Sequence, residues 1–156
     1  MNRRSSRPES MFFELRVRSS LDVFAVRDAV RTHAAAVGFG RTDVSELVIA
    51  ASELATNIVK YGVEGRFGAG ATVSLAHGPG LALVATDVGP PFHDFATALR
   101  DFHDDHGPLD VDARRSHRGL ASGLGAVVRF THRVEHEPHD RGKTIRAVRY
   151  LRPPTR

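Results

Sequence analysis

The chain has no cysteine, which excludes disulfides and thiolate metal ligands, so any metal must be held by oxygen or imidazole groups. No apolar run approaches the roughly 20 residues needed to span a bilayer. The polar segment 1–10 also lacks the apolar stretch of a secretory signal. These absences predict a cytoplasmic protein with no membrane partner.

Positive charge is present but is not concentrated. The formal net charge is +4 and the pI is near 10.3. One group of arginines lies in segment 3–7 and a second in segment 114–118, while the others alternate with acidic or apolar residues. This pattern does not favour a nucleic-acid partner, and the second group fits a phosphate-bearing small ligand equally well.

A length of 156 residues, of which 41% are hydrophobic, predicts one domain with a substantial core. We expect a disordered N-terminal arm at 1–11 and a single domain at 12–151. Two stretches of helical periodicity, 20–37 and 43–61, follow a first strand at 13–17. Gly38 should end the first helix in a left-handed conformation, and Asp43 should cap the second with Glu46 as its capping-box partner.

The rest of the chain alternates mainly between strands and polar segments. Strands at 72–77 and 81–87 should form a hairpin around Gly78 to Gly80, and strands at 132–136 and 144–151 should form another. Between the hairpins we expect a short helical stretch near 95–102, a lid at 93–118 and a helix from about 123 to 130. Histidines and aspartates at 93–106 are interpreted as a solvated part of this lid rather than as a zinc site. The order predicts an α/β chain of the α+β two-layer type, with a mixed, largely antiparallel sheet and helices on one face.

The helix at 43–61 carries a polar row on the side opposite its apolar residues. The row contains Glu46, Glu53, Asn57 and Lys60. Glu53 and Asn57 lie one turn apart, and two such oxygen donors can hold a divalent cation, while the carboxylate can also accept a proton. A solvated helix face has the same spacing, so this row alone does not decide the function. We interpret Lys60 as structural.

Two further motifs lie at predicted element boundaries. Asp87 ends a strand and begins DVGPPF; its carboxylate can accept from an exocyclic amine, and Gly89 lets a flat ring approach the backbone. The second motif, GLASGLG at 119–125, leads into a helix and leaves backbone N–H groups available to phosphate oxygens. Taken singly, each motif also fits an ordinary turn or capping feature.

Together and in this order, the motifs ELATN, DVGPPF and GLASGLGAV resemble the N, G1 and G2 boxes of GHKL ATPases, which have the Bergerat ATP-binding fold. The flanking sequences AVRDAVRTHAAAVGFG and SELVIAASELATNIVKYG are similar to those of the anti-sigma-factor serine/threonine kinases, specifically the RsbT-like switch kinases. The resemblance extends from Phe12 to Leu151.

The resemblance implies a role for each matching residue. Glu53 would be the catalytic base, Asn57 a magnesium ligand in contact with the nucleotide, and Asp87 the acceptor for the adenine amino group. Five other residues would contact the nucleotide through their backbone, and one of them, Gly89, would lie beside the adenine ring. The residues of the phosphate-covering segment are Gly119, Gly123, Leu124 and Gly125.

The function that the resemblance implies is ATP- and magnesium-dependent phosphorylation of a STAS-domain anti-sigma-factor antagonist. A PP2C-type phosphatase or a sigma factor would be a further partner. The alternative is a non-catalytic nucleotide-binding module that regulates a sigma factor or phosphatase by stoichiometric binding. Three positions depart from the family pattern. Pro91 and Ala121 replace glycines, and Lys143 stands where threonine is more common, so nucleotide affinity and lid closure are the properties that these changes affect.

Overall fold

The computed structural model describes residues 12–100, 103–104, 107–108 and 123–152. The predicted arm at 1–11, Gly119, Ala121 and most of the proposed lid lie outside these residues. A five-stranded sheet has the order β1-β2-β3-β7-β6, and every pairing within it is antiparallel. The sheet is therefore more uniform than the mixed, largely antiparallel one predicted. Its strands are β1 (Phe12–Val17), β2 (Gly65–Ser74), β3 (Gly78–Asp87), β6 (Arg133–His139) and β7 (Gly142–Tyr150).

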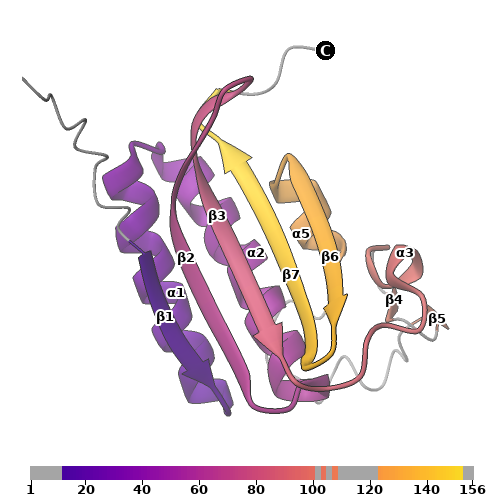
Figure 1. Ribbon diagram of the computed structural model, residues 1–156. Coiled ribbons are helices and arrows are strands. Elements are labelled where there is room, and N and C mark those ends of the chain that lie inside the picture. The colour runs from indigo at the N-terminus through magenta and orange to yellow at the C-terminus, as the bar shows by residue number, and fades with distance from the viewer. Residues whose placement is uncertain (1–11, 101–102, 105–106, 109–122, 153–156) are drawn as a thin grey trace, which may run out of the picture.

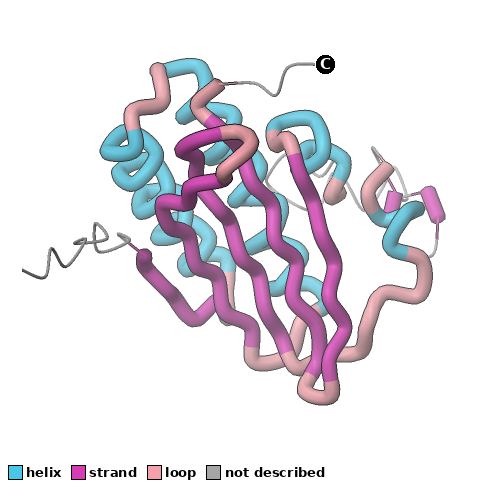
Figure 2. The backbone as a smooth tube through the Cα atoms, turned by 45° about the horizontal axis from the view of Figure 1, so that its top comes forward, coloured by secondary structure: helices cyan, strands magenta, loops and turns pink. Residues whose placement is uncertain are grey.

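The main helices α1 (Ser20–Val37), α2 (Arg41–Tyr61) and α5 (Gly125–Phe130) lie on one face of this sheet (Figures 1 and 2). The short helix α3 (Phe95–Ala98) and the two-residue strands β4 (His103–Asp104) and β5 (Gly107–Pro108) lie beyond the β6 edge. This arrangement confirms the two-layer α+β fold. Within the parts of the chain that the structure describes, no helix is both long and apolar enough to cross a bilayer.

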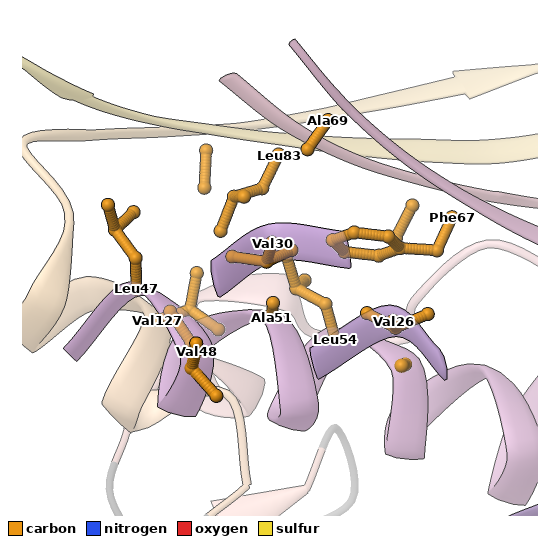
Figure 3. Packing of buried hydrophobic residues seen from close by; sticks show 14 of the residues in the cluster. Val26, Val30, Leu47, Val48, Ala51, Leu54, Phe67, Ala69, Leu83 and Val127 are labelled. Carbon is orange, nitrogen blue, oxygen red and sulfur yellow. The ribbon is translucent and has the colours of Figure 1, made fainter. Parts of the chain in front are cut away.

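The core lies between the helices and the sheet. Alternate residues of the strands face α1 and α2, whose apolar stripes follow the helical period. Figure 3 shows Phe67 and Leu83 of the sheet lying above Val30 and Leu54 of the helices, all four with 0% exposure. Val127 brings α5 into the same cluster beside Val48. The core therefore fixes α2 beneath the central strands.

The ends of the helices match the sequence only in part. Gly38 ends α1 with φ 112°, and its N–H donates to Ala34 and Ala35, as the left-handed stop requires. The second helix begins earlier than predicted, at Arg41, with Gly40 as its N-cap. The predicted capping by Asp43 is therefore wrong, because Asp43 already lies inside the first turn.

The first hairpin also differs from the prediction. Strand β2 begins at Gly65 instead of residue 72, and the turn lies at 75–77, directly before Gly78. Glycines hide the early part of this strand from a propensity argument, because they are depleted in strands. Close packing explains one of them, since a Cβ at Gly65 would lie 1.9 Å from Cγ2 of Ile58 on α2.

Candidate functional site

Asp87 lies at the end of β3, the central strand of the sheet, and is only 5% exposed. Its Oδ1 accepts a 2.7 Å hydrogen bond from the backbone N–H of Gly89. The next residue is held by the loop that follows α2, because the N–H of Val88 donates to the carbonyl oxygen of Val63 at 2.8 Å. The predicted adenine-binding carboxylate is thus fixed by short backbone contacts.

The most unexpected neighbour of Asp87 is Lys143. The two residues face each other in the β3–β7 register, and Nζ of Lys143 lies 2.9 Å from Oδ1 of Asp87. Their side chains are 5% and 6% exposed, so this is a buried ion pair. The ammonium also donates to the carbonyl oxygen of Pro90 at 2.7 Å. Because a buried charge is unfavourable without a partner, each of the two residues compensates the charge of the other.

An aromatic group lies next to this ion pair. The ring of Phe92 is 5.5 Å from Nζ of Lys143 and 5.2 Å from the rings of both Phe95 and His136. His136 on β6 stacks on Phe95 at 4.6 Å. Burial, and then the charge of Lys143, lower the pKa of His136. Its Nε2 is buried and has no hydrogen-bond partner among the described residues.

The polar row of α2 differs from a solvated face. Glu53 is buried, with 7% exposure, while Asn57 is half-buried. Glu46 does not form a capping box but accepts from the guanidinium of Arg149 on β7, which also donates to Asp43 at 2.7 Å. The alternative interpretation of this row, a solvated helix face, therefore does not hold at Glu53.

The end of α2 connects this row to Asp87. A Cβ at Gly62, the residue after α2, would lie 3.3 Å from Cβ of Asp87. Asn57 and Glu53 precede Tyr61, the last residue of α2, by one and two turns, or about 6 and 12 Å along the axis. Asp87 of β3 therefore lies at the C-terminal end of α2, and Asn57 and then Glu53 lie progressively farther from it along the helix.

The glycine-rich segment is described only from its second half. Gly123 has φ 69°, Leu124 is the N-cap of α5 and is 3% exposed, and Gly125 is the first residue of α5. The segment approaches α2, because α5 packs against that helix. With only six residues, α5 has a small helix dipole.

The proposed lid at 93–118 can be described in its first part alone. Asp94, one of the residues considered for a metal, instead caps α3 by accepting from the N–H of Thr97 at 3.1 Å. Across the described ranges, there is no group of three or more histidines or acidic residues that could hold a metal ion.

Two residues of this region were not predicted as functional or structural partners. Lys143 was noted as a departure, but its pairing with Asp87 was missed, and Arg149 was missed as the partner of Asp43 and Glu46. An antiparallel pairing of the strand ending at Asp87 with the strand beginning after Gly142 would have placed the opposite charges side by side. That pairing joins strands that are distant in sequence, and the sequence pattern alone does not fix it.

Residues 18–149 match the model of the histidine kinase-like ATPase domain, and the chain belongs to this family. The site therefore lies in an ATPase domain whose fold and motif order agree with the sequence prediction. Among characterised proteins, the chain is similar to the serine/threonine-protein kinase RsbT of Bacillus subtilis (strain 168). The two are 29% identical over 139 residues, which cover 88% of this chain and 96% of that kinase.

Proposed function

We propose that the protein is an ATP- and magnesium-dependent serine/threonine kinase that phosphorylates a STAS-domain partner in a sigma-factor or stress-signalling switch. The observation that carries this proposal is the order of Asp87, Asn57 and Glu53 along α2. A nucleotide whose base lies at Asp87 and whose phosphates extend along α2 would meet Asn57 first and Glu53 second. The similarity to a named serine/threonine kinase supports the same activity.

Base recognition would fall to Asp87. A buried carboxylate accepts readily from an exocyclic amine, and adenine presents one where guanine has a carbonyl oxygen. Gly89 contributes because its backbone runs beside this carboxylate, and a Cβ there would lie 2.7 Å from Oδ1 of Asp87. We therefore expect ATP and ADP to be bound in preference to GTP.

Magnesium binding would involve Asn57. Mg²⁺ prefers oxygen ligands and commonly binds through one or two protein groups together with substrate phosphates and water. A half-buried amide oxygen, with no cluster of acidic residues in the part of the chain that the structure describes, fits that pattern. When bound, the cation would neutralise phosphate charge, which is the main requirement of phosphoryl transfer.

Proton transfer would be the task of Glu53. Glu53 lies one turn from Asn57 on the same helix, on the side of Asn57 that is farther from the proposed position of adenine at Asp87. There it would accept the proton of a substrate serine or threonine hydroxyl as the oxygen attacks the γ-phosphorus and ADP leaves. Backbone groups of Gly119, Gly123, Leu124 and Gly125 would surround the phosphates, although Gly119 lies outside the described residues.

The partners follow from the same resemblance. We propose a STAS-domain anti-sigma-factor antagonist as substrate, with a PP2C-type phosphatase or a sigma factor as a further partner, and a cytoplasmic location. The second candidate function is a non-catalytic nucleotide-binding module. Pro91 and Ala121 leave this alternative open, because both replace glycines of the family pattern and stiffen the backbone near the nucleotide.

The variant Glu53→Gln tests which of the two functions is right. It keeps the shape of the side chain and removes the base, so phosphoryl transfer should fall about 10²- to 10⁴-fold while ATP binding remains. Glu46→Gln is the matched control, since it makes the same change on the same helix at the residue bound to Arg149. Transfer of labelled phosphate to a STAS-domain protein encoded nearby would be measured, with melting curves for both variants.

The outcome distinguishes the candidates because binding and transfer are measured separately. If the wild-type protein binds ATP and its partner tightly but transfers no label, the kinase function is wrong and the binding module takes its place. A Glu53→Gln variant that transfers label at the wild-type rate would remove Glu53 from the mechanism. Calorimetry that detects neither ATP nor ADP binding would contradict both functions.

A further inference from the structure

We propose that Lys143 is a second base-reading residue, which donates a hydrogen bond to the ring nitrogen N1 of adenine while Asp87 accepts from the neighbouring amino group. This inference rests on the proposed function, because it takes the adenine of ATP or ADP to lie at Asp87. It assigns a specificity role to a position where the resembled kinases more often have threonine.

The ammonium of Lys143 is fixed in place by its surroundings. It donates to Oδ1 of Asp87 at 2.9 Å and to the carbonyl oxygen of Pro90 at 2.7 Å. These two bonds use two of the three protons that a lysine ammonium carries. With 5% exposure of the side chain, the group is held by protein atoms and has lost most of its freedom to rotate. A third donor is thus held beside the carboxylate.

The carboxylate of Asp87 keeps an oxygen for the base. The bonds from Gly89 and Lys143 both fall on Oδ1. Each carboxylate oxygen has about two acceptor sites, so Oδ2 takes part in neither bond and can accept from the exocyclic amine. An acceptor and a donor therefore lie side by side on Asp87 and Lys143.

This pair is complementary to one edge of adenine. The amino group at C6 is a donor, and the adjacent N1 is an acceptor, so the base presents the opposite sequence of groups. A donor that carries a charge and is shielded from water makes a stronger hydrogen bond than a neutral one. Lys143 also compensates the charge of Asp87, so the base meets a neutral pair instead of an isolated anion.

The backbone makes this arrangement specific to position 143. Gly142 has φ 130°, and a Cβ on it would lie 1.9 Å from the carbonyl oxygen of Asp87. The close approach of the β6–β7 turn to the end of β3 sets the next side chain directly against the carboxylate. The ring of Phe92, 5.5 Å from Nζ, lies on the same group and favours the cation.

The test compares ADP with 1-deaza-ADP, which lacks the N1 acceptor and keeps the amino group. Calorimetry in the presence of magnesium should show the wild-type protein binding ADP roughly 10- to 100-fold more tightly than the analogue, the usual effect of one charge-assisted hydrogen bond. Lys143→Met should bind ADP more weakly by a similar factor and should no longer distinguish the two ligands. Lys60→Met, a change at the other lysine of the chain, is the control and should keep the wild-type preference.

Loss of Lys143 leaves the carboxylate of Asp87 buried without its cation, and this can unfold the variant. The double variant Asp87→Asn with Lys143→Met removes both charges, and it should fold and bind ADP and 1-deaza-ADP equally. The proposal is overturned if the wild-type protein binds the two ligands equally, if either variant keeps the preference, or if Lys143→Met binds ADP more tightly. A wild-type protein that binds no nucleotide would instead contradict the proposed function itself.

Discussion

Gly142 and Asp87 approach each other so closely that a Cβ on the glycine would lie 1.9 Å from the carbonyl oxygen of the aspartate. The contact joins the β6–β7 turn to the end of β3, and it requires a residue without a side chain. Gly142 also has φ 130°, which L-residues rarely adopt. The shape of the region around Asp87 therefore depends on one glycine outside the three sequence motifs.

Replacing Gly142 by alanine should destabilise the protein and weaken nucleotide binding together. Gly78→Ala is the control, because Gly78 also has a positive φ, 73°, but a Cβ there would meet nothing within 4 Å. We expect Gly78→Ala to lower the free energy of unfolding by about 1–2 kcal/mol and to leave ADP affinity unchanged. Gly142→Ala should cost more than this, with reduced affinity; denaturant unfolding and calorimetry would measure both. Equal behaviour of the two variants would show that the contact with Asp87 has no role.

Asn57→Ala should remove the magnesium dependence of nucleotide binding. In the wild-type protein, we expect ADP affinity to rise when magnesium is added, because the amide oxygen shares the cation with the phosphates. Thr56→Ala is the control, since Thr56 is half-buried on the same helix and adjacent in sequence. Both variants should keep a melting temperature close to that of the wild type. If Asn57→Ala retains the full magnesium effect, the cation is held by other groups.

Arg149→Lys should lower the free energy of unfolding by about 1–3 kcal/mol. The guanidinium donates to Asp43, Glu46 and the carbonyl oxygen of Phe130, and a lysine cannot reproduce this fork. The side chain of Arg149 is only 14% exposed, so water compensates these lost bonds poorly. The same change at Arg31, which is 54% exposed and pairs with one acidic residue, should alter stability by less than about 0.5 kcal/mol. Similar losses in the two variants would mean that the network of Arg149 adds nothing.

Acid should destabilise the fold through His136. Its pKa is lowered from 6.5 by burial and then by Lys143, so the unfolded chain binds a proton at a pH where the folded chain does not. The free energy of unfolding should therefore fall as pH drops through 6.5 and level off below the folded pKa. His136→Phe keeps an aromatic ring against Phe95 and should reduce this slope. A residual slope is expected from His132, whose pKa is lowered mainly by burial. An unchanged slope in urea unfolding across this range would contradict the role of His136.

Sequence periodicity was sufficient for most elements and for the fold class. The apolar stripe of α2 and the alternation in β1 are strong local signals, and both elements lie within two residues of their predicted bounds. The early part of β2 gave no such signal, because it contains glycines at 65, 68 and 70, of which Gly65 and Gly68 fit close packing rather than strand propensity. The prediction of a cap at Asp43 was wrong for another reason. Arg149, which is distant in sequence, binds both Asp43 and Glu46, the two residues of the predicted capping box.

The candidate site was predictable as a set of motifs but not as a set of contacts. Asp87, Asn57 and Glu53 were identified from strand-end position and helical spacing, and the structure places them in one order along α2. The burial of Glu53 and the ion pair with Lys143 depend on tertiary packing, which a single helix or strand pattern does not contain. Roles of all these residues stay predictions that the variants above test.

The strand order also determines how easily the segment that carries Asp87 unfolds locally. Strand β3 has a hydrogen-bonded neighbour on each side, so releasing Asp87 requires two ladders to break, whereas β1 and β6 each have one. Main-chain amide hydrogens near the end of β3 should therefore exchange with solvent through global unfolding, and those of β1 through local fraying. The carboxylate that we assign to base recognition thus belongs to one of the three interior strands, which should exchange more slowly than the two edge strands.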